Sequence, residues 1–205
     1  MNLKTPALNH FPFSVKINHP GGGTAIIFNE NRYHMEVLND ISADDNIENV
    51  WTLCRPKVEL SLAGIRVKRI AIGSYYVSTR TKNRQPIIDH IIEAIHMLRA
   101  KYDNQISFLI GGDFNRSDYS DILDSYGMLK QVVSVPTRNS ARLEIVLTDL
   151  HSLYHPVTTL SPLQVDTDKK GKDSDHEIVL FAPKSDRKYV KERKKMIVKT
   201  RPLST

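Results

Sequence analysis

One stretch of the chain repeats its apolar residues with the period of a helix. Between about residues 83 and 101 the apolar positions recur every three or four residues, and Asp89, Glu93 and Arg99 fall between them. This pattern predicts an amphipathic helix with one buried stripe. The stripe consists of Ile87, Ile88, Ile91, Ile92, Ile95 and Leu98.

Shorter apolar runs elsewhere predict strands, because they are bounded by Gly, Pro or polar residues and are too short for helices. The predicted strands are residues 24–28, 50–54, 58–62, 69–77, 108–110, 143–148 and 177–181. Ser117 is a suitable N-cap for a second helix that ends near Tyr126, before Gly127. Strands that alternate with helices along one chain predict an α/β or α+β fold.

A polar sequence, Gly111-Gly112-Asp113-Phe114-Asn115, follows one of the predicted buried strands. If the backbone is extended there, the side chains of Asp113 and Asn115 point to the same side. A carboxylate in this position can take a proton from water or bind a cation, and an amide can orient the water. The alternative is a local turn in which both side chains bond to neighbouring backbone groups.

Two more polar features lie next to or within predicted strands. Asp175 and His176 directly precede residues 177–181, and an imidazolium can neutralise charge that develops on a phosphate oxygen. Glu144 lies within the otherwise apolar segment 143–148, where a buried carboxylate needs a partner. The alternatives are an ordinary surface histidine and a glutamate on the solvent face of its strand.

Five segments of the chain carry these residues in a recognisable order. They are GGTAIIF at 22–28, SYYVS at 74–78, GGDFN at 111–115, PTRNSARLEIVLTD at 136–149 and SDHEIVLF at 174–181. In this order they resemble the motifs of the endonuclease/exonuclease/phosphatase family, over roughly residues 20–183. Their amino-acid sequences are most similar to those of the endonuclease domains of non-LTR retrotransposons.

The resemblance implies two packed β-sheets flanked by helices, in a four-layer sandwich. It also implies that the protein hydrolyses a phosphodiester in DNA with a divalent cation, usually Mg²⁺. In the family roles, Asp113 would activate the water or assist the leaving group, and Asn115 would hold the nucleophile and phosphate. His176 and Tyr76 would contact the scissile phosphate, and Asp175 would lie near the metal with Asp113.

Three positions depart from the family pattern. Glu144 replaces an aspartate that pairs with the active-site histidine, so it keeps the charge but is one methylene longer. Thr79 replaces an asparagine of the repair enzymes, which disfavours a repair role. The glutamate that is the principal metal ligand of the family lies upstream of its GG(V/T)A motif and has no counterpart here. We therefore expect weak Mg²⁺ binding, missing first strands and an open sheet edge.

These departures leave three functions open. The first is a retrotransposon-like, Mg²⁺-dependent DNA endonuclease, the second is an inactive remnant that at most binds nucleic acid, and the third is a phosphatase of the same family. For DNA, the resemblance and the loop positions indicate five side chains that can meet phosphates beside the cut. They are Arg80, Lys82, Arg84, Arg138 and Arg142.

The net charge of +6 belongs to the C-terminal end of the chain. Residues 184–201 carry nine basic and two acidic side chains, which leaves −1 for residues 1–183. We expect residues 1–183 to form the domain and residues 184–205 to be a basic tail, either bound to nucleic acid or disordered in solvent. The sequence TRPLS at 200–204 resembles a linker toward a reverse transcriptase.

Composition adds expectations about the surroundings of the protein. No stretch approaches the ~18 apolar residues that a membrane helix needs, so no membrane association is expected. Cys54 is the single cysteine and cannot form an internal disulfide, which favours an intracellular compartment. The basic tail also fits a nuclear address.

Overall fold

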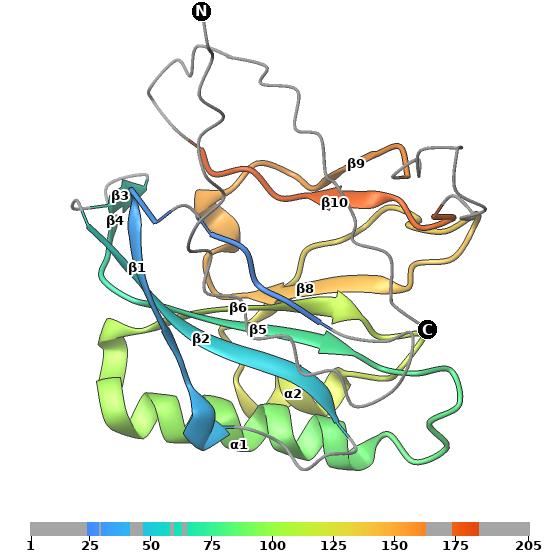
Figure 1. The fold of residues 1–205 in the computed structure, drawn as a ribbon, viewed down its shortest axis with the longest axis horizontal. Coiled ribbons are helices and arrows are strands. Elements are labelled where there is room, and N and C mark those ends of the chain that lie inside the picture. The colour runs from blue at the N-terminus through green and yellow to red at the C-terminus, as the bar shows by residue number, and fades with distance from the viewer. Residues whose placement is uncertain are drawn as a thin grey trace, which may run out of the picture.

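The computed structural model describes residues 24–28, 30–41, 47–57, 60–62, 65–162 and 174–184 (Figure 1). Its strands are β1 (Tyr33–Val37), β2 (Glu48–Pro56), β3 (Leu60–Leu62), β4 (Ile65–Val67), β5 (Ile70–Tyr76), β6 (Ser107–Asp113), β7 (Lys130–Gln131), β8 (Glu144–Thr148), β9 (Thr158–Leu160) and β10 (Ile178–Leu180). Its helices are α1 (Gln85–Tyr102) and α2 (Ser120–Ser125), with short 3-10 turns η1 (Asn39–Ile41), η2 (Asp103–Gln105) and η3 (His151–Leu153).

A six-stranded mixed sheet organises the fold, in the order β1-β2-β5-β6-β8-β7. The pair β5–β6 is parallel, because α1 crosses over between them, and the other neighbouring pairs are antiparallel. Helices α1 and α2 lie on one face of this sheet, and the two-stranded pair β9–β10 lies on the other side (Figure 1). This is the predicted mixed α/β fold, with two sheets flanked by helices.

Helix α1 confirms the predicted amphipathic stripe. Five of the six predicted apolar residues are buried, Ile92 is partly buried, and Ala94 joins them. Pro86 fits in the first turn, where a proline costs no helical hydrogen bond. No helix in the described ranges is long and apolar enough to cross a membrane.

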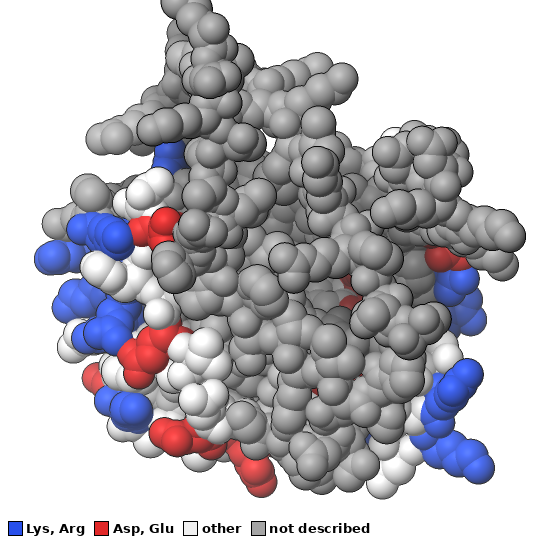
Figure 2. All heavy atoms as spheres, in the orientation of Figure 1, with Lys and Arg blue, Asp and Glu red and all other residues white. Residues whose placement is uncertain are grey.

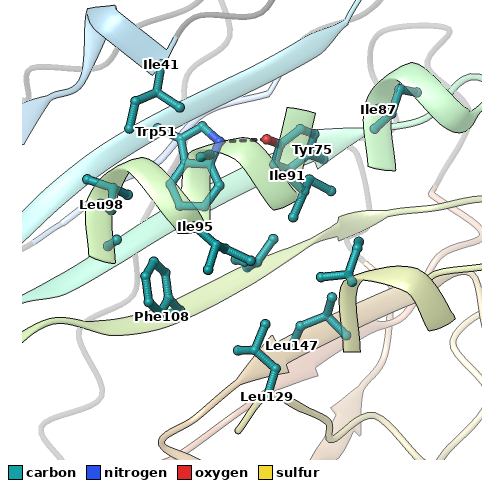
Figure 3. Packing of buried hydrophobic residues seen from close by; sticks show 14 of the residues in the cluster. Ile41, Trp51, Tyr75, Ile87, Ile91, Ile95, Leu98, Phe108, Leu129 and Leu147 are labelled. Carbon is teal, nitrogen blue, oxygen red and sulfur yellow. Dashed lines mark hydrogen bonds between the residues drawn. The ribbon is translucent and has the colours of Figure 1, made fainter. Parts of the chain in front are cut away.

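The main core lies between the sheet and its two helices (Figure 3). Trp51 of β2 is 1% exposed, and its indole Nε1 donates a 2.6 Å hydrogen bond to the hydroxyl of Tyr75 on β5. The Tyr75 hydroxyl also lies 2.7 Å from Nδ1 of His90 on α1, whose Nε2 is 3.0 Å from the Ile41 carbonyl. This chain of bonds satisfies polar groups that burial would otherwise penalise.

The opposite face of the sheet is covered as well. A second buried cluster there contains Cys54, Val67, Ile70, Leu150 and Leu153. The strand residues of the two clusters alternate along β5 and β6, as the two-residue period of a strand requires. Residues at the ends of these strands can therefore be assigned to a face by counting.

Several sequence predictions differ from the structure in detail. Residues 24–28 form no strand, although they are apolar, because no described strand pairs with them. Helix α2 begins at Ser120 with Tyr119 at the N-cap, because the Ser117 hydroxyl instead bonds to the Phe114 carbonyl. Strands β1, β4, β7 and β9 were not predicted. The predicted strand 58–62 is observed for 60–62, and residues 185–205 lie outside the described part of the chain.

Candidate active site

A row of four polar side chains crosses the end of the central sheet. In the strand register, Glu48 of β2 pairs with Tyr76 of β5, Tyr76 with Asp113 of β6, and Asp113 with Glu144 of β8. The residues next to this row in the chain, such as Tyr75 before Tyr76 and Ile145 after Glu144, belong to the helix-side core. The row therefore lies on the face opposite the helices, toward the side of β9 and β10.

Three residues from distant segments meet at one end of this row. One ligand atom from each of Asp113, Glu144 and His176 lies within 4.8 Å of the other two. His176 is placed by the backbone, because the neighbouring Glu177 N–H donates a 2.7 Å bond to the carbonyl of Thr137. Asp113, Glu144 and His176 were each singled out from sequence, and the structure brings them together.

The imidazole of His176 is oriented by Glu144. Nδ1 of His176 donates a hydrogen bond to Oε1 of Glu144, which leaves Nε2 as the ring atom available to other groups. The two side chains are only 28% and 18% exposed, so solvent screens this pair weakly. Glu144 therefore lies on an interior face of its strand, and the solvent-face alternative is wrong.

The remaining Glu144 oxygen gives a test of whether a cation fits here. Oε2 of Glu144 is buried and has no hydrogen-bond partner among the described residues, which is costly for a carboxylate oxygen. Glu144 lies in the cluster with Asp113, and two carboxylates with an imidazole are suitable ligands for a divalent cation. The donor set therefore fits a divalent metal.

Asp113 has an unusual electrostatic environment. Burial raises the pKa of its carboxyl group, and the nearby Glu144 carboxylate acts in the same direction, while a 3.0 Å bond from the Asn115 N–H and the proximity of His176 oppose the rise. A raised pKa means that Asp113 holds a proton more readily than an exposed aspartate does. This is a useful property for a group that accepts and returns a proton.

Asn115 does not project beside Asp113 as extended backbone would allow. Its φ is 44°, in the left-handed region, and its Nδ2 donates a 2.9 Å bond to the Val77 carbonyl. The bond from Asn115 N–H to Asp113 Oδ1 forms the local turn that was the alternative. Asn115 thus ties the end of β6 to the residue after β5.

Asp175 lies outside the three-residue cluster. Its Oδ2 accepts a 2.7 Å bond from Nε of Arg138, and that hydrogen bond lowers the pKa of the Asp175 carboxyl group. Its Oδ1 is 3.7 Å from Nε2 of His176. The expectation that Asp175 lies with Asp113 is therefore not met in this structure, because the arginine competes for its carboxylate.

The five predicted basic residues differ in what holds them. Arg138 is paired with Asp175, and Arg84 donates a 2.9 Å bond to the Asn115 carbonyl. Arg142 bonds to the Val133 carbonyl and the Tyr119 hydroxyl, at 3.1 Å each. Arg80 and Lys82 are exposed in the loop after β5. Figure 2 shows basic side chains at the edge of the molecule toward which β5 and β6 run in Figure 1.

Two residues near the site were missed from sequence. Glu48 belongs to the polar row, and its Oε2 is buried without a hydrogen-bond partner in the described ranges. Only the strand register reveals this, since an acidic residue before an apolar run is unremarkable. Arg116 directly follows Asn115, is exposed and lines two cavities of about 320 and 430 Å³. Its position beside the GGDFN segment was the available signal.

Comparisons with known proteins give structural neighbours but no sequence match. No protein-family model matches the chain, and no curated protein matches it. The human Nocturnin catalytic domain with bound sulfate is 17% identical, with a TM-score of 0.46, over 78% of this chain and 62% of that one. This chain therefore spans less than two thirds of the Nocturnin domain.

Two further solved structures are similar at the same level. An endonuclease/exonuclease/phosphatase family protein from Bacteroides thetaiotaomicron is 11% identical, with a TM-score of 0.49, over 77% of this chain and 68% of that one. D. rerio TDP2 complexed with single strand DNA product is 10% identical, with a TM-score of 0.43, over 83% of this chain and 76% of that one. Because these TM-scores are below 0.5, the function proposed next rests on the residues of the chain itself.

Proposed function

We propose that this protein is a metal-dependent phosphodiester hydrolase of the endonuclease/exonuclease/phosphatase family, acting as an endonuclease on DNA. The observation that carries the proposal is the meeting of Asp113, Glu144 and His176. These residues come from three segments that match the family motifs in order, and they are separated in sequence by at least 31 positions.

His176 is the group best placed to act on a phosphate. Its Nδ1 is held by Glu144, so the ring is fixed and Nε2 can donate to a phosphate oxygen when the ring is protonated. Tyr76, on the neighbouring strand and on the same face, offers its hydroxyl to the same substrate group.

Asp113 is the general acid–base of the proposed reaction. Its carboxyl group accepts a proton from the attacking water or returns one to the leaving oxygen. Asn115 positions this carboxylate through its backbone N–H and by its bond to Val77. A divalent cation held by Asp113 and Glu144 would neutralise phosphate charge as a Lewis acid. Mg²⁺ is the cation that we expect.

DNA is the proposed substrate because the sequence of residues 136–149 resembles that of retrotransposon endonucleases and because arginines surround the site. An Mg²⁺-dependent nuclease of this kind would act in the nucleus, and a full-length element would join it to a reverse transcriptase. The basic residues 184–201 would add phosphate contacts.

Nicking of supercoiled plasmid tests the proposal directly. We expect nicking by the purified chain that needs Mg²⁺ or Mn²⁺ and is lost in Asp113→Ala and His176→Ala. The control is Lys130→Ala, since Lys130 is exposed and pairs with Thr148, at the other end of β8 from Glu144. A folded wild-type protein that never nicks DNA would instead be an inactive remnant. Hydrolysis of phosphomonoesters without nicking would indicate a phosphatase.

A further inference from the structure

Arg116 directly follows Asn115 beside the candidate site and, like Arg80, is exposed. Within the described part of the chain, no hydrogen bond or ion pair is made by its side chain, whereas Arg84, Arg138 and Arg142 are each bound to another group. A fully charged, unpaired guanidinium is free to bind an anion in a two-point geometry.

This arginine belongs to a tight turn that follows β6. Asn115 and Arg116 have φ values of 44° and 61°, two consecutive left-handed residues that directly follow Phe114. For residues with a Cβ this conformation costs on the order of 1 kcal/mol each. The turn is closed by a 2.9 Å bond from Ser117 N–H to the Phe114 carbonyl, which fixes where the arginine begins.

Arg116 lines a groove of about 430 Å³, a size typical of ligand sites. The polar residues that line this groove are Thr79, Asn115, Arg116, Arg138, Asn139 and Ser140. They include no carboxylate and two guanidinium groups, of which that of Arg138 is paired with Asp175. The charge of the groove therefore suits an anion.

The groove adjoins the candidate active site on one side. Asn115 lines it and is bonded through its N–H to Asp113. Arg138, on the same wall, is paired with Asp175, the residue before His176. An anion in the groove would thus lie next to a phosphate at Asp113 and His176, as consecutive phosphates do in a nucleic-acid strand.

We propose that the Arg116 groove binds a phosphate that flanks the scissile bond of a nucleic-acid strand, so that Arg116 is a substrate-positioning residue. This inference rests on the function proposed above, and it names the substrate as an oligonucleotide with at least two phosphates. In this role the groove binds the sugar-phosphate backbone of the nucleic acid and no base edge. It should therefore add affinity without sequence preference.

Two substrates separate this role from a structural one. Bis(p-nitrophenyl) phosphate has a single phosphodiester, so Arg116→Ala should leave its kcat/KM unchanged. A short DNA duplex has flanking phosphates, and its kcat/KM should fall about tenfold in Arg116→Ala, with partial rescue in Arg116→Lys. The matched control, Lys130→Ala, should match the wild type on both substrates. An equal change on the two substrates, or none on the duplex, would overturn the proposal.

Binding gives a test that does not depend on cleavage. Affinity for a fluorescein-labelled duplex is measured by polarisation in EDTA over a series of salt concentrations. Arg116→Ala should reduce the slope of log K against log salt by about 0.9, the contribution of one phosphate contact. An unchanged slope, or no binding by the wild type, would contradict the proposal that the Arg116 groove binds a phosphate. A wild type that binds with this slope but never cleaves would contradict the proposed hydrolase activity alone.

Discussion

His176 and Glu144 are joined by a hydrogen bond between Nδ1 and Oε1 although 32 positions separate them in the chain. In the family that the sequence resembles, the partner of this histidine is an aspartate. Here the partner is Glu144, which the strand register places directly opposite Asp113. We expect Glu144→Asp to withdraw the carboxylate by about one methylene and to slow plasmid nicking on the order of 10²-fold. Faster nicking in this variant would show that the longer side chain is a defect.

Cation binding should be visible without any reaction. If Asp113 and Glu144 hold a divalent cation, Mg²⁺ or Mn²⁺ raises the midpoint of thermal unfolding by binding only the folded state. The shift should grow with cation concentration and vanish in Glu144→Ala, as followed by differential scanning fluorimetry. Lys130→Ala should keep the full shift. An equal shift in Glu144→Ala would place the cation elsewhere.

Tyr75 and Tyr76 are consecutive residues whose hydroxyl groups should serve different purposes, stability for Tyr75 and activity for Tyr76. The Tyr75 hydroxyl bonds to Trp51 and His90, so Tyr75→Phe removes a partner from the buried Trp51 indole N–H and from the partly buried His90 ring. We expect a loss of about 1–3 kcal/mol in the free energy of unfolding, measured in urea. Tyr76→Phe, on the site face, should keep its stability and lose nicking activity. Similar stabilities for the two variants would contradict the buried bonds.

Asp149 should make stability fall as pH rises. Burial raises the pKa of Asp149 to about 6, from an ordinary value of 3.8, even though its Oδ1 accepts a 2.9 Å bond from Phe108 N–H. A raised pKa favours the folded state at low pH, and this benefit is lost as pH rises from about 4 through 6. Asp149→Asn keeps an acceptor and avoids the buried charge.

The unfolding temperature of Asp149→Asn should therefore exceed that of the wild type at pH 7.5. The difference should shrink as the pH is lowered toward 4, where the aspartate is protonated as well. On the order of 1–3 kcal/mol is expected at neutral pH. A difference that is independent of pH would exclude titration of Asp149 as its cause.

Two glycines give a matched pair for the geometry beside the site. Gly112 has a φ of 150°, and a Cβ there would lie 1.8 Å from the Tyr75 carbonyl oxygen, whereas a Cβ on Gly127 would meet nothing within 4 Å. Gly112→Ala should prevent stable folding, because β5 and β6 would have to separate. Gly127→Ala should fold normally, as circular dichroism and thermal melts would show. A well-folded Gly112→Ala would mean that the strands can move apart.

Local sequence patterns were sufficient to predict structure where the structure of a segment depends mainly on its own residues. The helix at 83–101 was predictable because its apolar stripe repeats from Ile87 to Leu98, about three turns, and α1 is observed at Gln85–Tyr102. Asp113, Glu144 and His176 were predictable because short motifs mark them. By contrast, an apolar run becomes a strand only if another strand pairs with it, and residues 24–28 have no such partner in the described structure.

Other features depend on register and backbone conformation, which local patterns do not reveal. Glu48 reaches the polar row only because β2 and β5 pair at Tyr76. Asn115 turns away from Asp113 because its backbone is left-handed, and Asp175 is drawn to Arg138 across 37 positions. Each outcome is set by contacts between segments, which compete with the conformation that the local sequence favours.

The burial of Cys54 has a practical consequence for chemical labelling. The thiol is 4% exposed, and burial raises its pKa to about 11, so very little reactive thiolate exists at neutral pH. The native chain is therefore nearly inert to maleimides without any substitution. Ser140→Cys, at an exposed position on the Arg116 groove, would carry a single fluorophore there. Its emission would report directly when an oligonucleotide enters.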